Sequence, residues 1–316
     1  MKIYFAPMEG ITTYIYRGLH YKYFKGVDTY FTPFLSPTKN GSYTPREKKD
    51  ILPENNKGVP VVPQILANNV VYFNQLAGEL KDFGYKEVNL NLGCPSGTVT
   101  SKGKGSGFLL EPYDLEKFLD GIFEKQVLPI SVKTRMGFDE EEEWAYLLEV
   151  FGRYPIKELQ VHARVRQDFY KKPVRKTCFL NSIEGVQLPL CYNGDLFTVE
   201  DLREWKEQKK LDALMLGRGL IANPGLLMEE AGEVCTMDTY WKFLEELELA
   251  YFEELGNNAL YKMKELWTYM AHSFSDVDKC LKKIRKAKNS MEYHRAVQEL
   301  KQESRKEVWT CRDTIF

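Results

Sequence analysis

Hydrophobic positions along the chain follow two alternating patterns. Short runs rich in β-branched and aromatic residues recur, and longer stretches with apolar residues three and four positions apart separate them. This alternation is typical of repeated βα units. Eight runs predict strands, and they span Lys2 to Met8, Thr29 to Leu35, Val59 to Leu66, Glu87 to Gly93, Pro129 to Arg135, Glu158 to Arg164, Pro189 to Asp195 and Ala213 to Gly219.

The stretches between the runs predict helices that cover the sheet. The clearest are Val70 to Phe83, Asp114 to Glu124, Glu140 to Phe151 and Val199 to Lys209. Eight strands with alternating helices indicate an α/β fold of the (β/α)8 TIM-barrel type. A doubly wound open sheet is the competing fold, but its phosphate loop should follow the first strand. The segment Ala6-Pro7-Met8-Glu9-Gly10 is not such a loop.

The strand pattern stops after Asn223-Pro224-Gly225, and from about Met237 the chain is helical in composition. We therefore expect a barrel domain over residues 1–235 and a small all-helical domain over residues 236–316. Within the helical part, Lys279 to Lys288 carries six cations on an apolar stripe. This face could contact the phosphate backbone of a nucleic acid, or it could simply be a solvated helix face.

Charge and cysteine content narrow the class of protein. Lys and Arg total 44 against 45 for Asp and Glu, so global charge does not indicate a nucleic-acid partner. The six cysteines lie far apart, with Cys178 and Cys191 the closest pair, which argues against a metal site and for reduced thiols in the cytoplasm. We see neither an export signal nor a membrane-spanning run, so we expect a soluble protein without membrane contact.

Polar side chains collect at or near the carboxyl ends of the predicted strands, while the other strand positions are expected to be apolar. Burying one such group unpaired costs on the order of 1–3 kcal/mol, so many of them in one place indicate a polar ligand at the face where barrel enzymes work. They are Gln64, Asn91, Lys133, Arg135, His162, Arg164, Asn193, Asp195 and Arg218.

Cys94 follows the fourth predicted strand, in Asn89-Leu90-Asn91-Leu92-Gly93-Cys94-Pro95. The glycine-rich segment Ser96 to Gly107 comes next and predicts a mobile lid. The thiol could be a nucleophile, a proton donor or an inert core group. No Cys-His-Asn relay appears at recognisable local spacing, which slightly favours the proton donor.

The last two strands end in small residues with available backbone N–H groups. Asn193-Gly194-Asp195 and Leu216-Gly217-Arg218-Gly219 lie where barrels commonly bind a phosphate, so they favour a phosphate-bearing cofactor. Lys133 would suit an electron-rich ring or a phosphate. His162 could act as an acid, a base or a hydrogen-bond donor.

Taken in order along the chain, these motifs resemble those of the tRNA-dihydrouridine synthases. That family pairs an FMN-binding barrel with a C-terminal helical domain, so the resemblance spans the whole chain. It is carried by Ala6-Pro7-Met8-Glu9-Gly10, Gln64, Asn89 to Pro95, Val132-Lys133-Thr134-Arg135, Val161-His162-Ala163-Arg164, Asn193-Gly194-Asp195 and Gly217-Arg218-Gly219.

The resemblance implies an enzyme that uses FMN, reduced by NADPH, to saturate the C5–C6 bond of particular uridines in tRNA. Hydride would pass from flavin N5 to C6, and Cys94 would protonate C5. Asn91 and Arg135 match positions facing the ring and the uracil, and Arg164 and Tyr170 match the substrate side. The positions that match flavin contacts are Pro7, Met8, Gln64, Lys133, His162, Asn193, Gly194, Asp195, Gly217 and Arg218.

The chain also departs from the family pattern. It has Ala163-Arg164-Val165-Arg166-Gln167-Asp168-Phe169-Tyr170 where many members continue with Gly-Arg-Thr and a later Gln, and the second strand ends in Phe34-Leu35-Ser36-Pro37 rather than an acidic residue. Competing functions are an FMN-dependent ene reductase or dihydropyrimidine-type dehydrogenase, and an RNA-binding module with a vestigial barrel. We expect a monomer, and the sequence does not indicate which uridine is modified.

Overall fold

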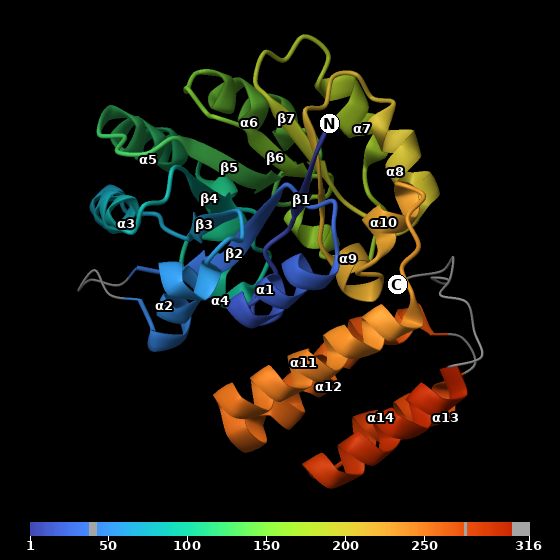
Figure 1. The fold of residues 1–316 in the computed structure, drawn as a ribbon. Helices are drawn as coiled ribbons and strands as arrows, with labels where there is room; N and C mark the ends of the chain where they lie inside the picture. Colours follow the sequence, from blue (N-terminus) through green and yellow to red (C-terminus); the bar gives the residue numbers. More distant parts are fainter. Residues whose placement is uncertain (38–42, 275–276, 305–316) are drawn as a thin grey trace. The chain divides into compact units, whose positions relative to one another are not determined.

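The computed structural model describes residues 1–37, 43–274 and 277–304. Eight parallel strands close into a barrel in chain order, and helices lie outside them (Figure 1). The predicted (β/α)8 barrel is therefore confirmed. The strands are β1 (Lys2–Phe5), β2 (Thr29–Leu35), β3 (Val61–Ile65), β4 (Val88–Leu92), β5 (Ile130–Arg135), β6 (Leu159–His162), β7 (Leu190–Asn193) and β8 (Ala213–Leu216).

Most strands are shorter than the apolar runs that predicted them. The first run stops pairing before Pro7, which has no N–H to donate to a neighbouring strand. The last run was predicted to Gly219, but β8 ends at Leu216 and a short helix, α9 (Arg218–Ala222), begins two residues later. The strand prediction was wrong at this end because a short apolar run fits a buried helix as well as a strand.

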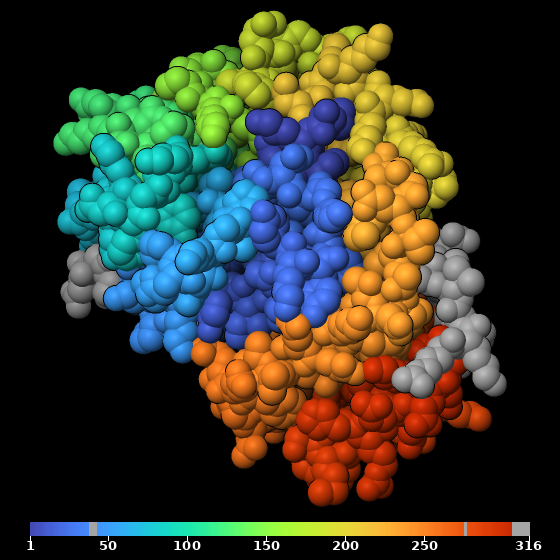
Figure 2. Space-filling model, in the orientation of Figure 1, coloured from blue at the N-terminus to red at the C-terminus, as the bar shows by residue number. Residues whose placement is uncertain are grey.

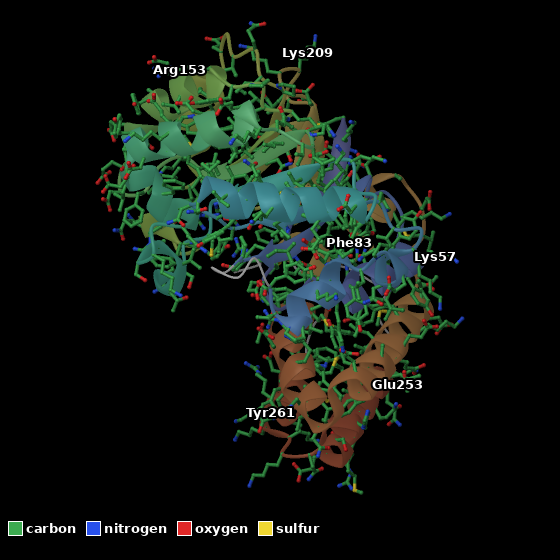
Figure 3. The ribbon with its side chains drawn as sticks, turned by 90° about the vertical axis from the view of Figure 1, so that its left-hand side faces the viewer. Lys57, Phe83, Arg153, Lys209, Glu253 and Tyr261 are labelled. Carbon is green, nitrogen blue, oxygen red and sulfur yellow. The ribbon has the colours of Figure 1, made fainter. Side chains whose placement is uncertain are left out.

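Helices fill the connections between the strands. The four predicted helices correspond to α3 (Val70–Asp82), α5 (Pro112–Glu124), α6 (Glu143–Gly152) and α8 (Val199–Lys206). Arg153, just after α6, projects from the outside of the barrel (Figure 3). The remaining connections contain α1 (Tyr14–Tyr23), α2 (Pro45–Ile51), α4 (Gly97–Thr100), α7 (Lys176–Ser182), α10 (Leu226–Glu230) and the 3₁₀ turns η1 (Pro53–Asn56), η2 (Gly105–Leu110) and η3 (Arg166–Asp168).

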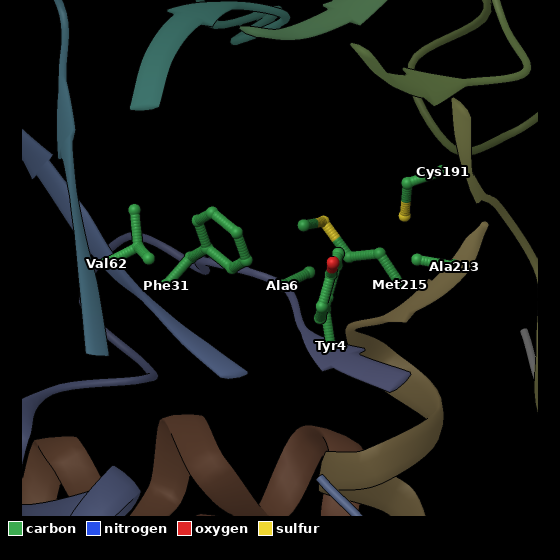
Figure 4. Close-up of a cluster of buried hydrophobic side chains, with 7 residues drawn as sticks. All are labelled: Tyr4, Ala6, Phe31, Val62, Cys191, Ala213 and Met215. Atoms are coloured by element: carbon green, nitrogen blue, oxygen red, sulfur yellow. The ribbon is translucent and has the colours of Figure 1, made fainter. Parts of the chain in front are cut away.

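Side chains from several strands pack inside the barrel, which is therefore filled rather than open. The rings of Tyr4 and Phe31 meet edge to face with their centroids 5.6 Å apart. Figure 4 shows the buried cluster, which consists of Tyr4, Ala6, Phe31, Val62, Cys191, Ala213 and Met215.

The chain forms two compact units. The first contains the barrel strands and comprises Met1–Glu9, Asp28–Asp195 and Lys206–Leu216. The second comprises Gly10–Val27, Leu196–Trp205 and the chain from Gly217 onward. It therefore includes α1, most of α8, α9 and α10 as well as the C-terminal helices, and does not begin at residue 236. A separation of catalysis from tRNA binding between the two domains stays a prediction.

Four further helices follow β8 and its short helices, which confirms the predicted helical C-terminal region. They are α11 (Met237–Leu255), α12 (Ala259–Met270), α13 (Asp278–Lys286) and α14 (Ser290–Ser304), with the 3₁₀ turns η4 (Gly256–Asn258) and η5 (Ala271–Ser273) around α12. Trp267 Nε1 donates to Tyr293 Oη at 3.0 Å, and Tyr293 donates to Glu248 at 2.6 Å. These bonds join α12, α14 and α11.

The aromatic face of α1 explains why this N-terminal helix belongs to the second unit. Phe243 of α11 makes edge contacts with Tyr16, Tyr23 and Phe24, with ring centroids 5.1–6.1 Å apart. Across the described ranges, no helix has both the length and the apolarity needed to cross a membrane.

Candidate active site

The barrel brings most of the predicted polar residues to the carboxyl ends of adjacent strands. Asn91 of β4 pairs in register with Lys133 of β5. Two positions further along, Arg135 of β5 pairs with His162 of β6, which pairs with Asn193 of β7. Side chains from three neighbouring strands thus occupy the same level of the barrel mouth, which is the face where barrel enzymes carry out their chemistry.

A chain of side-chain hydrogen bonds runs through the buried part of the barrel below this level. Asn91 Nδ2 donates to Gln64 Oε1 at 2.7 Å, and Gln64 Nε2 donates to Asn89 Oδ1 at 2.7 Å. Asn89 Nδ2 then donates to Gln160 Oε1 at 3.0 Å, and Gln160 Nε2 donates to Glu158 Oε1 at 3.1 Å. Each of these side-chain amides therefore donates towards Glu158 and accepts from the side of Asn91.

The two ends of this chain require that direction. At the mouth, Asn91 Oδ1 accepts from the backbone N–H groups of Gly93 and Cys94 at 3.0 and 2.9 Å, and these groups can only donate. At the other end, the Glu158 carboxylate accepts from Gln160 and also from Tyr4 Oη at 2.9 Å. Burial raises the pKa of Glu158, and these two hydrogen bonds oppose the rise.

The sequence prediction missed most of this chain. Asn89, Gln160 and Ser131, whose hydroxyl accepts from Asn89 Nδ2 at 2.9 Å, are polar residues inside strands that were expected to be apolar, and all three are fully buried. Asn89 was visible as a polar interruption of a strand. Its partners were not predictable, because they come from strands up to 71 residues away.

Cys94 is held at its backbone from two sides. Its N–H donates to Asn91, while its carbonyl accepts from Ser106 N at 3.1 Å and from Ser106 Oγ at 2.8 Å. Burial raises the pKa of the Cys94 thiol, although the Ser96 N–H and the cations of Arg135 and Lys133 oppose the rise. The thiol is therefore neutral at neutral pH, which suits a proton donor better than a nucleophilic thiolate.

The segment after Cys94 contains α4 and η2 and packs against the thiol-bearing residue. A Cβ atom on Gly105, whose φ is +57°, would lie 2.9 Å from the Cys94 carbonyl oxygen and 3.0 Å from its Cβ. Glycine is thus required at this position by both conformation and space. The mobility predicted for Ser96 to Gly107 stays a prediction.

Lys133 lies at the mouth with one hydrogen bond to a neighbouring strand. Its Nζ donates to Asn193 Oδ1 at 2.9 Å, and Asn193 Nδ2 donates to the Met215 carbonyl at 2.7 Å. Burial lowers the pKa of Lys133 to about 8, and the nearby Arg135 contributes to this lowering. A cation this poorly solvated is suited to an electron-rich partner.

Arg135 connects two loops at the mouth. Its Nε donates to the Gly93 carbonyl at 3.0 Å, and its Nη1 donates to the carbonyls of Val165 and Phe169 at 2.9 and 3.0 Å. Arg135 is 1% exposed, and its guanidinium lies 5.3 Å from the Tyr170 ring. The resemblance implied that Arg135 faces the ring and the uracil. In the structure its hydrogen bonds hold the loops after β4 and β6 together.

Arg164 and Asp195, assigned by resemblance to substrate and cofactor respectively, bind each other. Two parallel bonds of 2.9 and 2.5 Å join the guanidinium to the carboxylate, and Arg164 Nε also donates to the Lys172 carbonyl at 2.6 Å. The Arg164 side chain is 3% exposed. A part-buried bidentate pair of this kind fixes the loops that follow β6 and β7.

The remaining predicted site residues lie in the connections that follow β1, β6, β7 and β8. Tyr170 is 52% exposed and meets His162 edge to face at 5.7 Å. Pro7 and Met8 come two and three residues after the end of β1 and are half-buried. At Gly194, a Cβ would lie 2.8 Å from Val174 Cγ1. Gly217 and Arg218 belong to the second unit, where Arg218 begins α9 with its guanidinium 5.3 Å from the Phe197 ring.

The side chains at the mouth fit a flavin. The isoalloxazine edge presents several acceptors and one N–H donor, and the mouth offers the ammonium of Lys133 and the imidazole of His162. The amides of Gln64 and Asn91 belong to the buried hydrogen-bond chain below the mouth, where each NH2 group has one N–H beyond the bond described above. Among the described residues, no three His, Cys, Asp or Glu side chains are grouped closely enough to hold a metal ion.

Two relatives match this chain in sequence over most of its length. A probable tRNA-dihydrouridine synthase of Staphylococcus epidermidis is 28% identical over 276 residues, which cover 83% of this chain and 81% of that protein. The tRNA-dihydrouridine(16) synthase of Aquipseudomonas alcaligenes is 28% identical over 266 residues, covering 80% and 84%.

Two solved structures show the same fold. Morphinone reductase superposes with a TM-score of 0.53 at 13% identity and covers 76% of this chain and 88% of its own. 2-Naphthoyl-CoA reductase superposes with a TM-score of 0.56 at 11% identity and covers 73% and 50%. The family model described as dihydrouridine synthase matches residues 4–314. The chain therefore belongs to the dihydrouridine synthase family of oxidoreductases.

Proposed function

We propose that this protein reduces the C5–C6 double bond of specific uridines in tRNA, with FMN as cofactor and NADPH as reductant. The observation that carries the proposal is the neutral thiol of Cys94, whose backbone is held by hydrogen bonds, with Lys133 nearby and the buried amide chain below the barrel mouth. A proton donor next to groups that match a flavin is the combination that ene reduction of a pyrimidine needs.

The residues of the barrel mouth would hold the cofactor. Gln64, Lys133, His162 and Asn193 would contact the ring, and Gly194 and Asp195 would lie on the phosphate side. The family resemblance also assigns phosphate binding to Gly217 and Arg218, which follow β8 in the chain. When bound, FMN reduced by NADPH supplies the hydride that adds to C6 of the uracil.

The chain itself supplies the proton and the geometry. The thiol group of Cys94 holds the proton that C5 receives. The side chain of Asn91 keeps Cys94 in place by accepting a hydrogen bond from the Cys94 backbone N–H. The target base must leave the tRNA stack to reach the thiol. Asn91, Arg164 and Tyr170 would line its path, with Arg164 acting through the loop that it holds to Asp195.

The groove between α13 and α14 is suited to the tRNA backbone. Its volume is about 520 Å³, and four of the lysines in Lys279 to Lys288 line it together with Arg295. The apolar residues of the same segment are buried, so the lysines face solvent, and both helices are visible as red surface in Figure 2. We assign tRNA binding to this C-terminal helical domain and expect a cytoplasmic monomer.

The proposal is tested first on tRNA and then on the protein. Mass spectrometry of tRNA from cells lacking this protein should show one or more uridines without the added mass of two hydrogen atoms, and it identifies the position at the same time. The purified protein should be yellow. Unchanged dihydrouridine at every tRNA position, or a colourless protein that does not bind added FMN, would contradict the proposal.

A further inference from the structure

An aromatic residue occupies a backbone conformation that normally belongs to glycine in the loop after β6. Lys171 N donates to the Asp168 carbonyl at 3.0 Å and closes a four-residue turn. Phe169, its first central residue, has φ 48° and ψ −108°, which is the glycine position of a type II′ turn. Among the described non-glycine residues, Asp195 alone shares a positive φ, and Asp tolerates it far better than Phe.

The neighbours of the turn maintain this strain. Arg135 Nη1 donates to the Phe169 carbonyl at 3.0 Å. On the preceding residue, the buried Asp168 carboxylate accepts from Arg175 at 2.9 and 3.2 Å and from the Val165 N–H at 3.2 Å. A glycine would form the same turn without strain, so the conformation of the turn does not explain why this position carries a Phe. Strain that is over-determined in this way is typical of functional sites.

The Phe169 ring is presented at the surface beside the thiol loop. Phe169 is 37% exposed, and its ring lies 4.9 Å from the guanidinium of Arg166, which itself lies 5.0 Å from the ring of Phe138. Arg166 Nε donates at 3.2 Å to the carbonyl of Pro95, the residue after Cys94. We call these three side chains the Phe138–Arg166–Phe169 stack.

The stack differs in place and chemistry from Tyr170, the next residue of the turn. The Tyr170 ring contacts His162 and Arg135 and therefore belongs to the barrel mouth. The Phe169 ring contacts Arg166 instead and lies on the rim. The two rings thus present aromatic surface at two neighbouring places. Tyr170 lies at the mouth, where the target uridine would bind, and Phe169 lies outside it.

We propose that the exposed face of Phe169 stacks against an unpaired tRNA base adjacent to the target uridine. When the target leaves the stack, its neighbour loses a stacking partner, and an aromatic ring backed by a guanidinium replaces it. Arg166 is bonded to Pro95, the residue after Cys94, so its cation lies near the thiol loop. There it can attract a backbone phosphate of the tRNA segment that carries the target uridine. The inference rests on the proposed function, because it requires tRNA at the barrel mouth.

Three variants of the FMN-loaded enzyme test the proposal. Phe169→Leu keeps apolar volume without a ring face, Phe169→Gly removes both the ring and the strain, and Phe169→Tyr keeps the ring. We expect the Kd for unmodified tRNA, measured by filter binding, to rise about tenfold or more for Leu and Gly, as for the loss of one base–aromatic stack. The Tyr variant should bind as the parent does, and the KM for tRNA should follow the Kd.

Thermal unfolding separates this role from simple packing. Because glycine is unstrained at this φ, Phe169→Gly should melt no lower than Phe169→Leu. The matched control is Tyr146→Ala: this residue on α6 is 43% exposed and its hydroxyl donates to Glu116 at 2.6 Å, and the loss of its ring should not affect tRNA binding.

Equal tRNA affinity of the parent and the Leu and Gly variants would overturn the inference, as would a Tyr variant that binds as weakly as Gly. A parent enzyme that does not bind tRNA at all would instead contradict the proposed function. The two failures are therefore distinguishable in one set of titrations.

Discussion

At the scale of single residues, the site is governed by how each polar group is solvated and paired. Of the four cations predicted at strand ends, three differ in role. The guanidinium of Arg135 binds backbone carbonyls and that of Arg164 binds Asp195. Lys133 has a pKa lowered to about 8 by burial. Lys133 is thus the cation best placed to act on a bound ring, while these two arginines position loops.

The thiol gives a prediction at the same scale. A general acid contributes about 10²–10⁴-fold to rate, so Cys94→Ser, which keeps the size but not the acidity, should lose dihydrouridine formation by about that factor. The FMN absorbance should be retained, since the flavin-contacting residues are unchanged. Single-turnover dihydrouridine formation measures the effect, and full turnover by the Ser variant would exclude Cys94 as proton donor.

The pH profile follows from the direction of the Cys94 pKa shift. In the proposed reaction the active form of Cys94 is the neutral thiol, and burial raises its pKa above the ordinary value of 9.0. Ionisation of the thiol should therefore lower the rate only above about pH 9, whereas a fall near pH 8 should come from Lys133, whose pKa burial lowers to about 8. A fall near pH 7 would show that the thiol is not buried in this way.

At the scale of elements, the loop between β4 and α5 determines where the thiol lies. Ser106 of η2 holds the Cys94 carbonyl, and Gly105 lies against it with no room for a side chain. The loop and the strand end are thus one packed element. A substitution in this loop should therefore displace the Cys94 thiol even though it alters no group that takes part in the reaction.

Gly105→Ala tests this coupling. The positive φ and the 2.9 Å approach to the Cys94 carbonyl should cost about 2 kcal/mol of unfolding free energy, and the displaced thiol should lower kcat. The control is Gly78→Ala in α3, where the new Cβ meets nothing within 4 Å, and it should raise stability by about 0.5–1 kcal/mol. Urea unfolding and turnover of both variants give the comparison, and a Gly105 variant with normal kcat would contradict the coupling.

At the scale of the whole molecule, a nearly neutral chain carries a local basic groove. The lysines of α13 face solvent because Cys280, Leu281 and Ile284 are buried in the helical unit. One of them, Lys283, pairs with Glu299 of α14. The groove therefore combines paired and solvent-facing charge, and its net positive sign is a property of the fold rather than of the composition.

Neutralising this groove should weaken tRNA binding in a salt-dependent way. The triple change Lys282→Ala, Lys283→Ala and Lys286→Ala should lower affinity at low salt and reduce the slope of log K against log salt by about 0.7–0.9 for each phosphate that is no longer neutralised. The control removes equal charge at Lys206, Lys209 and Lys210, which precede the amino end of β8 in the chain; Lys209 is labelled in Figure 3. Equal salt slopes for the two triple variants would show that the groove does not bind tRNA.

The sequence by itself determined the eight βα units, the helical region at the C-terminus and the thiol at the end of β4. These features follow from local periodicity and from polar residues within apolar strands, which are visible without knowing any distant contact. The motifs at the strand ends were also sufficient to identify the family.

Only the tertiary structure decided which of these groups pair with one another. Arg164 meets Asp195 across 31 positions of sequence, and Asn89 meets Gln160 across 71, because strand register brings them together and no local pattern encodes it. The turn at Phe169 is decided in the same way: its sequence carries no turn glycine, and the bonds from Arg135 and Arg175 impose the conformation from outside.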